Sequence, residues 1–102
     1  MAAQVIWSHL ALADFNEVHA SIAADKPGAA DSYCSRLHDF AGASGTFPLM
    51  GRIVPEFGLD WLRELIFPPY RIIYQVDAAQ TTTVIVRIWH SKRGKPELVF
   101  PA

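Results

Sequence analysis

Two nearly continuous runs of β-branched and aromatic residues, 70–76 and 82–89, constrain the fold of this chain more than any other feature. Such runs predict strands, and their lack of polar alternation is typical of strands that are covered on both faces. The Ala78–Thr81 link between them is short enough for a hairpin. The runs therefore predict two neighbouring central strands of one sheet.

The first half of the chain has the periodicity of helices instead. Apolar residues fall on one side of two consecutive segments, at Ala11, Phe15, Val18 and Ile22 and then at Ala30, Tyr33, Cys34, Leu37, Phe40 and Ala41. Ser8 is a suitable N-cap for the first helix, from whose apolar stripe Asp14 is excluded. Pro27 suits the first turn of the second helix, and residues 42–45 are expected to end it. A short strand at 4–7 precedes both helices.

Residues 61–67 predict a further strand of mixed polarity, and the tail 96–101 is apolar enough to lie against the sheet. We therefore expect one α+β domain over residues 1–102, in which an N-terminal strand and a two-helix hairpin pack on an antiparallel sheet of about four strands. The helices should cover one face of this sheet. The other face should remain partly open unless a partner covers it.

Composition and charge exclude several functional classes. The formal net charge of -1 weighs against unaided binding to a nucleic-acid backbone, although Lys and Arg outnumber the acidic residues after Arg63. The single Cys34 excludes an internal disulfide and fits a cytoplasmic protein. No apolar run approaches the roughly 20 residues that span a bilayer. The histidines lack metal-ligand spacing and no glycine-rich phosphate loop occurs, so we expect neither metal nor cofactor.

Arg71 lies within the first apolar run, where strand alternation puts it on the same face as Ile73 and Gln75. A guanidinium in such a strand must form an ion pair, reach water or meet a ligand. Two interpretations are open for Arg71. It pairs with Glu64 or another carboxylate of the sheet, or it recognises an anion or a protein partner.

Other cations raise the same question. Arg87 lies close to Trp89, and stacking of the guanidinium on the indole is the favoured interpretation. Arg63 should face away from its neighbour Glu64, so the two are not expected to pair. The turn at 90–95 is either a solvated loop or a surface that presents Lys92 and Arg93 to a phosphate or carboxylate. His90 in that turn is either structural or a general acid or base.

Several of these segments resemble the ParE/RelE superfamily of type II toxins, also called plasmid stabilisation proteins. The resemblance covers nearly the whole chain and is carried by Val5–Ser8, Pro48, Gly51-Arg52, Pro55-Glu56, Leu62–Leu65, Tyr70–Tyr74, and His90 with Arg93. It implies a compact fold in which a helical hairpin packs on an antiparallel sheet. It also implies a toxin that a cognate antitoxin keeps silent.

The superfamily contains two activities. RelE-like members cut mRNA in the ribosomal A site, whereas ParE-like members block DNA gyrase. The cleaving members are similar at Arg71 and Arg93, whose charges would stabilise the reacting phosphate, but they also use lysines in the preceding strand and often a C-terminal tyrosine. Residues 62–65 contain no lysine, and the tail ends near Phe100 without a tyrosine. Another cleaving subgroup uses a Glu and a His as its acid–base pair. Glu56 or Glu64 would form such a pair with His90.

These departures and the near-neutral charge favour the ParE-like branch, a gyrase inhibitor bound by an antitoxin. The alternatives are a ribosome-dependent endoribonuclease with Arg71, Arg93 and His90 as catalytic residues, or a non-toxic module that only binds an antitoxin. The residues expected to bind partner or target are Arg63, Arg71, Arg87, Lys92, Arg93 and Phe100. The apolar tail and the half-open sheet predict a protein partner in all three cases.

Overall fold

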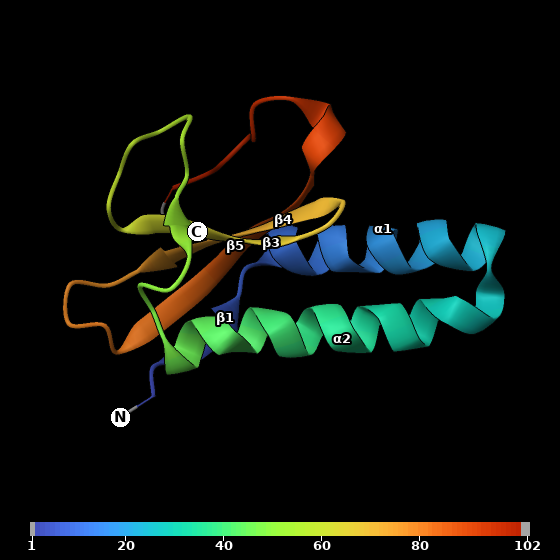
Figure 1. Ribbon diagram of the computed structural model, residues 1–102, viewed down its shortest axis with the longest axis horizontal. Coiled ribbons are helices and arrows are strands. Elements are labelled where there is room, and N and C mark those ends of the chain that lie inside the picture. The colour runs from blue at the N-terminus through green and yellow to red at the C-terminus, as the bar shows by residue number, and fades with distance from the viewer. Residues whose placement is uncertain (1, 101–102) are drawn as a thin grey trace.

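The computed structural model describes residues 2–100 as two helices packed on a five-stranded sheet (Figure 1). The elements in chain order are β1 (Gln4–Trp7), α1 (His9–Asp25), α2 (Pro27–Thr46), β2 (Arg52–Ile53), β3 (Leu62–Phe67), β4 (Tyr70–Val76), β5 (Thr82–His90) and a short 3₁₀ helix (Ser91–Arg93). This arrangement confirms the predicted α+β fold. Of the predicted tail, residue 101 lies outside the described part.

The sheet has the strand order β1-β5-β4-β3-β2. The pairs β2–β3, β3–β4 and β4–β5 are antiparallel, and the two apolar runs, β4 and β5, are inner strands of the sheet as expected. The N-terminal strand β1 belongs to the same sheet and pairs parallel with β5, with Gln4 opposite Thr82 and Trp7 opposite Ile85. The sheet is therefore mixed and has one strand more than expected. Strand β1 and the two-residue β2 are its edge strands, on either side of the three antiparallel strands β5, β4 and β3.

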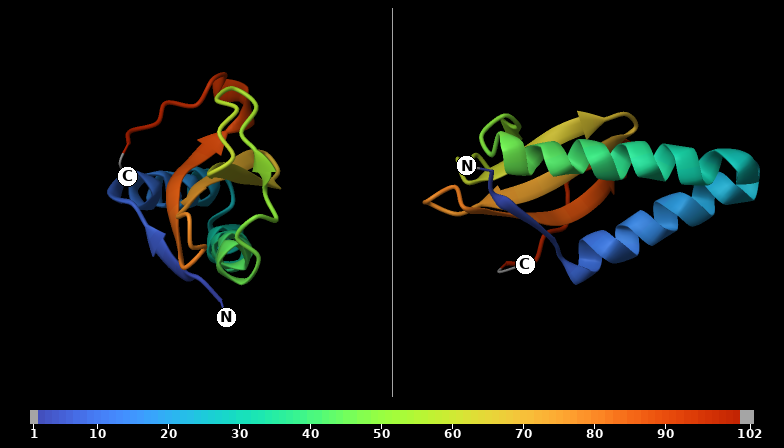
Figure 2. Two further views of the ribbon diagram at one scale, coloured as in Figure 1. Left: turned by 90° about the vertical axis from the view of Figure 1, so that its left-hand side faces the viewer. Right: turned by 90° about the horizontal axis from the view of Figure 1, so that it is seen from below.

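The helical hairpin covers one face of the sheet (Figure 2). Ser8 is the N-cap of helix α1, as predicted: the Ser8 Oγ accepts a hydrogen bond from the backbone N–H of Ala11 at 3.1 Å and donates one to the carbonyl of Val86 at 3.0 Å. The second bond ties the helix start to β5. The core between helices and sheet is formed by Ala11, Val18, Cys34, Leu37, Ala41, Leu65, Ile72, Tyr74, Val76, Ile85 and Ile88. Neither helix in the described part is long and apolar enough to cross a membrane.

Helix α2 does not end at residues 42–45, as we expected, but continues to Thr46. The reason is its packing against β1 and β5. A Cβ on Gly45 would lie 2.6 Å from Cγ2 of Val5 and 2.8 Å from the carbonyl oxygen of Ala3. The buried Ser44 hydroxyl bonds that of Thr83 at 3.1 Å. The small residues therefore permit close approach of helix and strand rather than ending the helix.

The second face of the sheet is covered by the chain itself, so the expectation of a half-open sheet is wrong. A second core of Val54, Leu62, Ile73, Val86 and Trp89 lies on this face. The loop 54–61 adds Phe57 and Leu59 to it, and the C-terminal tail adds Leu98. Figure 2 shows this loop and the tail on the side of the sheet away from the helices. Alternation along β4 puts Arg71 on the same face as Ile73, as predicted.

Candidate functional site: a neutralised arginine and an exposed basic turn

Arg71 is held by two carboxylates and is only 8% exposed. Its Nε donates to Oε1 of Glu64 at 2.6 Å, and its two terminal nitrogens donate to the two carboxylate oxygens of Glu56 at 2.8 and 2.7 Å. Such a bidentate pair is among the strongest side-chain interactions in proteins. Of the two interpretations of Arg71, the ion pair is the one that the structure shows.

Glu64 extends this cluster to a second arginine. It is 1% exposed on β3, opposite Arg52 of β2, whose Nε donates to Oε2 of Glu64 at 2.6 Å. Two guanidiniums thus alternate with two carboxylates. Hydrogen bonds from Arg71 lower the pKa of Glu56 from 4.5 to about 2, and hydrogen bonds to Glu56 chiefly raise the pKa of Arg71. The charge of Arg71 is therefore neutralised within the fold.

Arg87 is also committed to the fold. Its Nε and one terminal nitrogen donate to the carboxylate of Asp14 at 2.8 and 2.9 Å, and its other terminal nitrogen donates to the carbonyl of Glu97 at 2.9 Å. The guanidinium lies 5.0 Å from the ring centre of Trp89, which confirms the predicted stack. Asp14, excluded from the apolar stripe of α1, is nevertheless buried, because Arg87 and the N–H of Ile88 satisfy it.

Arg63 donates to three backbone carbonyls instead of to Glu64, in agreement with the predicted facing. Its Nε bonds the carbonyl of Asp60 at 2.8 Å, and Nη1 bonds those of Gly51 at 3.1 Å and Leu49 at 3.3 Å. The side chain thus fixes the segments on both sides of β2. Because these three bonds hold its guanidinium, Arg63 is less available to a partner than we expected.

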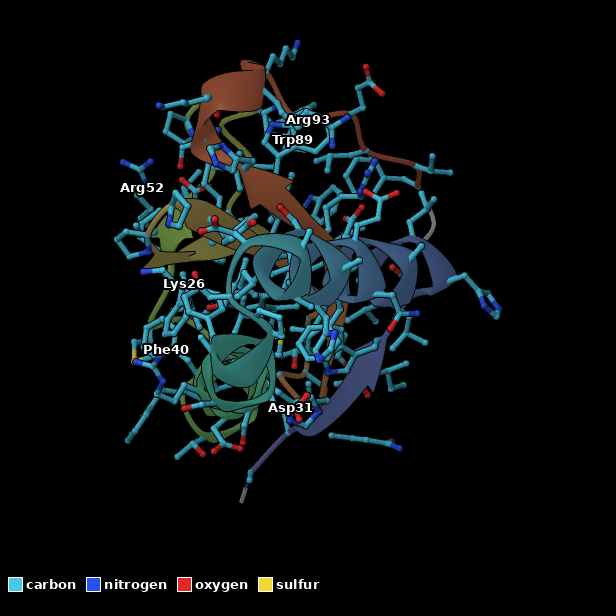
Figure 3. The ribbon with its side chains drawn as sticks, turned by 90° about the vertical axis from the view of Figure 1, so that its right-hand side faces the viewer. Lys26, Asp31, Phe40, Arg52, Trp89 and Arg93 are labelled. Atoms are coloured by element: carbon cyan, nitrogen blue, oxygen red, sulfur yellow. The ribbon has the colours of Figure 1, made fainter. Side chains whose placement is uncertain are left out.

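Arg93 differs from Arg63, Arg71 and Arg87. Its guanidinium carbon lies 3.9 Å from the ring centre of Trp89, whose indole N–H donates to the carbonyl of Gly94 at 3.1 Å. The residue is exposed and forms no ion pair with any carboxylate of residues 2–100. Figure 3 shows it beside Trp89 in the same part of the molecule as Arg52. Arg93 and the exposed Lys92 are the predicted cations that remain available to a ligand.

His90 contacts Tyr70 edge to face, with 5.2 Å between the ring centres. Its Nδ1 accepts a hydrogen bond from the N–H of Lys92 at 3.1 Å, which caps the 3₁₀ helix and leaves Nε2 as the ring nitrogen that can donate a hydrogen bond. A hollow of about 160 Å³ is lined by Asp14, Glu17, Val18, Ser21, Tyr70, Ile88, His90 and Arg93. The structure thus brings His90 and Arg93 together.

Neither Glu56 nor Glu64 lines that hollow, so the structure does not place either predicted glutamate there with His90; the glutamate that lines it is Glu17. Arg71 and Glu56 line a different hollow of about 460 Å³ with Arg52 and Ser91. Phe100 is also remote from His90: it contacts Trp61 edge to face at 5.3 Å and lies over the start of β5. The predicted site residues therefore divide among separate surfaces.

Residues 5–94 match the family described as "ParE toxin of type II toxin-antitoxin system, parDE". The chain belongs to the ParE toxin family. It is 38% identical over 92 residues to Toxin RelE2 of Caulobacter vibrioides, which covers 89% of this chain and 98% of that protein. Both matches place the protein in the ParE/RelE superfamily that its motifs resemble.

Solved structures share the fold of this ParE-family protein. A chain of the chromosomal ParDE system from P. aeruginosa superposes with a TM-score of 0.73 at 16% identity, covering 87% of this chain and 96% of its own. A chain of the RelBE2 toxin–antitoxin complex from Mycobacterium tuberculosis gives 0.64 at 23% identity, with 88% and 92% covered. A mutant of E. coli RelE in the free state gives 0.65 at 12% identity, with 92% and 88% covered. At these identities the likeness concerns the fold alone.

Proposed function

We propose that this protein is the toxin of a type II toxin–antitoxin system, that it arrests growth in the cytoplasm by inhibiting DNA gyrase, and that a cognate antitoxin neutralises it. The observation that carries the choice of target is the pairing of Arg71 with Glu56 and Glu64. In the RNA-cleaving branch, an arginine at this position would stabilise the charge that develops on the reacting phosphate. In this protein the positive charge of Arg71 is already neutralised by the two carboxylates.

An approaching phosphate would meet repulsion as well as a missing cation. Glu64 occupies the strand in which cleaving members carry lysines, and it is buried between Arg52 and Arg71. Displacing Glu56 from Arg71 would break a bidentate pair and bring two anions together. The formal net charge of -1 also gives little attraction to ribosomal RNA. These features favour a protein target over an RNA substrate.

The antitoxin is proposed because structurally similar proteins belong to toxin–antitoxin systems. The P. aeruginosa and M. tuberculosis structures are described as a ParDE toxin–antitoxin system and a RelBE2 toxin–antitoxin complex. The family is likewise described as the toxin of a type II toxin–antitoxin system. A toxin of this kind needs a partner that binds it tightly until growth arrest is required.

The deciding experiment uses the purified chain. We expect it to inhibit supercoiling by DNA gyrase, or to trap cleaved DNA, while messages in the arrested cells stay intact in primer extension. Normal supercoiling at a large excess of folded protein would refute the choice of gyrase. Unaffected growth on expression without a partner would instead support a non-toxic antitoxin-binding module.

One observation favours the endoribonuclease as the second candidate. His90 and Arg93 line one hollow, so both side chains can contact one RNA phosphate. This alternative predicts cuts in the ribosomal A site that disappear in both Arg93→Ala and His90→Ala. Cleavage that persists in either variant would exclude this pair as the catalytic residues.

A further inference from the structure

A band of exposed apolar side chains surrounds the β4–β5 turn, away from the cations of the candidate site. Five large apolar residues at this end of the molecule are exposed, namely Phe47, Leu49, Met50, Trp61 and Phe100. Phe47 is 62% exposed, more than any other large apolar residue in the described part. Figure 1 shows the turn, drawn orange, beside the segment that follows α2, drawn green. We call these five residues the apolar band.

Three hollows run along this band and share lining residues. One of about 830 Å³ lies between Phe47, Leu49, Met50 and the turn residues Ala79 and Gln80. The next, of about 480 Å³, shares Leu49 and Gln80 with the first and contains Trp61. A third, of about 520 Å³, lies between Trp61 and Phe100. The hollows therefore form one continuous apolar surface rather than isolated exposed residues, as protein-binding surfaces do.

The band and the exposed cations lie at opposite ends of the central strands. Tyr70 pairs with His90 at one end of β4, next to Arg93, and Val76 pairs with Thr83 at the other end, next to the band. The two pairs lie about 20 Å apart, because they are at the two ends of the seven-residue strand β4. One molecule can therefore contact two partners through two surfaces of different chemistry.

The rim of the band is acidic. Asp60 and Asp77 are exposed and line the central hollow. Hydrogen bonds from Thr81 lower the pKa of Asp77, which keeps its carboxylate ionised. Arg63 lines the same hollow, but its guanidinium is bound to the carbonyls of Asp60, Gly51 and Leu49. The two carboxylates outnumber this guanidinium, so the hollow presents a net negative charge to a partner.

We propose that the apolar band binds a segment of the antitoxin that places apolar side chains in the hollows and a lysine or arginine against Asp60 and Asp77. This inference rests on the proposed function for the identity of the partner. A second copy of the chain fits less well, because a two-fold dimer through the band would place two surfaces of the same net negative charge against each other. Opposite charges on a partner remove that repulsion.

Two leucines provide a matched test of the apolar contacts. Leu49 in the band and Leu12 on α1 are both 47% exposed. The chain and its variants are titrated with the protein encoded by the neighbouring reading frame, and the dissociation constant is measured by calorimetry. We expect Leu49→Ser to weaken binding about tenfold or more and Leu12→Ser to change it less than about twofold. Wild-type affinity in Leu49→Ser and in Phe47→Ser would overturn the proposal.

Two aspartates test the charge in the same titration. Asp60→Lys should weaken binding about tenfold, with a smaller effect at high salt, whereas Asp39→Lys on α2 should leave it nearly unchanged. Equal affinities of the two variants would refute a cationic segment in the partner.

A concentration-dependent dimer of the free chain that Leu49→Ser dissociates would favour a second copy and also overturn the proposal. The readout does not involve growth arrest or gyrase, so failure of the proposed target leaves this test intact. Absence of binding by the wild-type chain would instead count against the proposed antitoxin.

Discussion

At the scale of single residues, Arg71 shows how burial decides the role of a charge. A buried guanidinium is tolerated only when carboxylates and hydrogen bonds replace its water, and here Glu56 and Glu64 do so. No buried side-chain nitrogen or oxygen of residues 2–100 lacks a hydrogen-bond partner. Breaking one link of this cluster should therefore leave an uncompensated charge.

Glu64→Gln is expected to lower the free energy of unfolding by about 3 kcal/mol, because it removes the carboxylate shared by Arg52 and Arg71. Glu17→Gln on the exposed side of α1 serves as the control and should change stability by less than about 0.5 kcal/mol. Urea unfolding measures both. A cost below about 1 kcal/mol for Glu64→Gln would show that the ion pairs contribute little.

The same cluster predicts a pH dependence of stability. The folded-state pKa of Glu56 lies at about 2, below its ordinary value of 4.5. The ion pair with Arg71 therefore contributes fully above pH 4.5 and is lost as the pH falls toward 2. Unfolding by urea at a series of pH values should show stability falling over this range, and less steeply in Glu56→Gln. Parallel curves for the two proteins would contradict the assignment.

At the scale of elements, the contact between α2 and β1 is set by glycine. A Cβ on Gly45 would overlap Val5 and Ala3, whereas one on Gly42, in the same helix, meets nothing within 4 Å. The Gly45 position thus fixes how closely the N-terminal strand approaches the helix, and with it the position of β1 beside β5.

Gly45→Ala is expected to cost about 1–3 kcal/mol of stability, because the backbone of residue 3 and Val5 must move. Gly42→Ala is the matched control and should stabilise the protein by up to about 1 kcal/mol through helix propensity. Chemical unfolding of the two variants measures the difference. Equal stabilities of the two variants would mean that β1 moves away from the helix without loss of stability.

At the scale of the whole molecule, two surfaces of different chemistry lie about 20 Å apart along the central strands. The basic turn carries Lys92 and Arg93, and the other end carries the apolar band with its acidic rim. This arrangement predicts that binding to the target and binding to the antitoxin can be impaired separately.

Arg93→Ala should raise the protein concentration needed for half-inhibition of gyrase by about tenfold, because Arg93 is exposed, unpaired among residues 2–100 and held on Trp89. Its affinity for the antitoxin should stay within about twofold of wild type, and its stability within about 1 kcal/mol. Arg36→Ala on α2 is the control cation. Full inhibition by Arg93→Ala would remove Arg93 from the target-binding surface.

Much of this architecture follows from local patterns. Continuous apolar strands, a helical stripe and a Ser N-cap each depend on neighbours a few residues apart, so the helical hairpin, the central strands and the face of Arg71 were all predictable. The stack of Arg87 on Trp89 was predictable for the same reason, since the two residues are two positions apart in one strand.

The sequence by itself determined the family, the α+β fold and the set of candidate cations. Only the tertiary structure decided which cations are free. Glu56, Glu64 and Arg71 come from a loop and two strands, and Asp14 meets Arg87 across 73 positions of sequence. No spacing rule links such residues, because their distance is set by how loops and helices close over the sheet. The covered second face has the same cause: loop 54–61 and the tail fold back through contacts that no periodicity encodes.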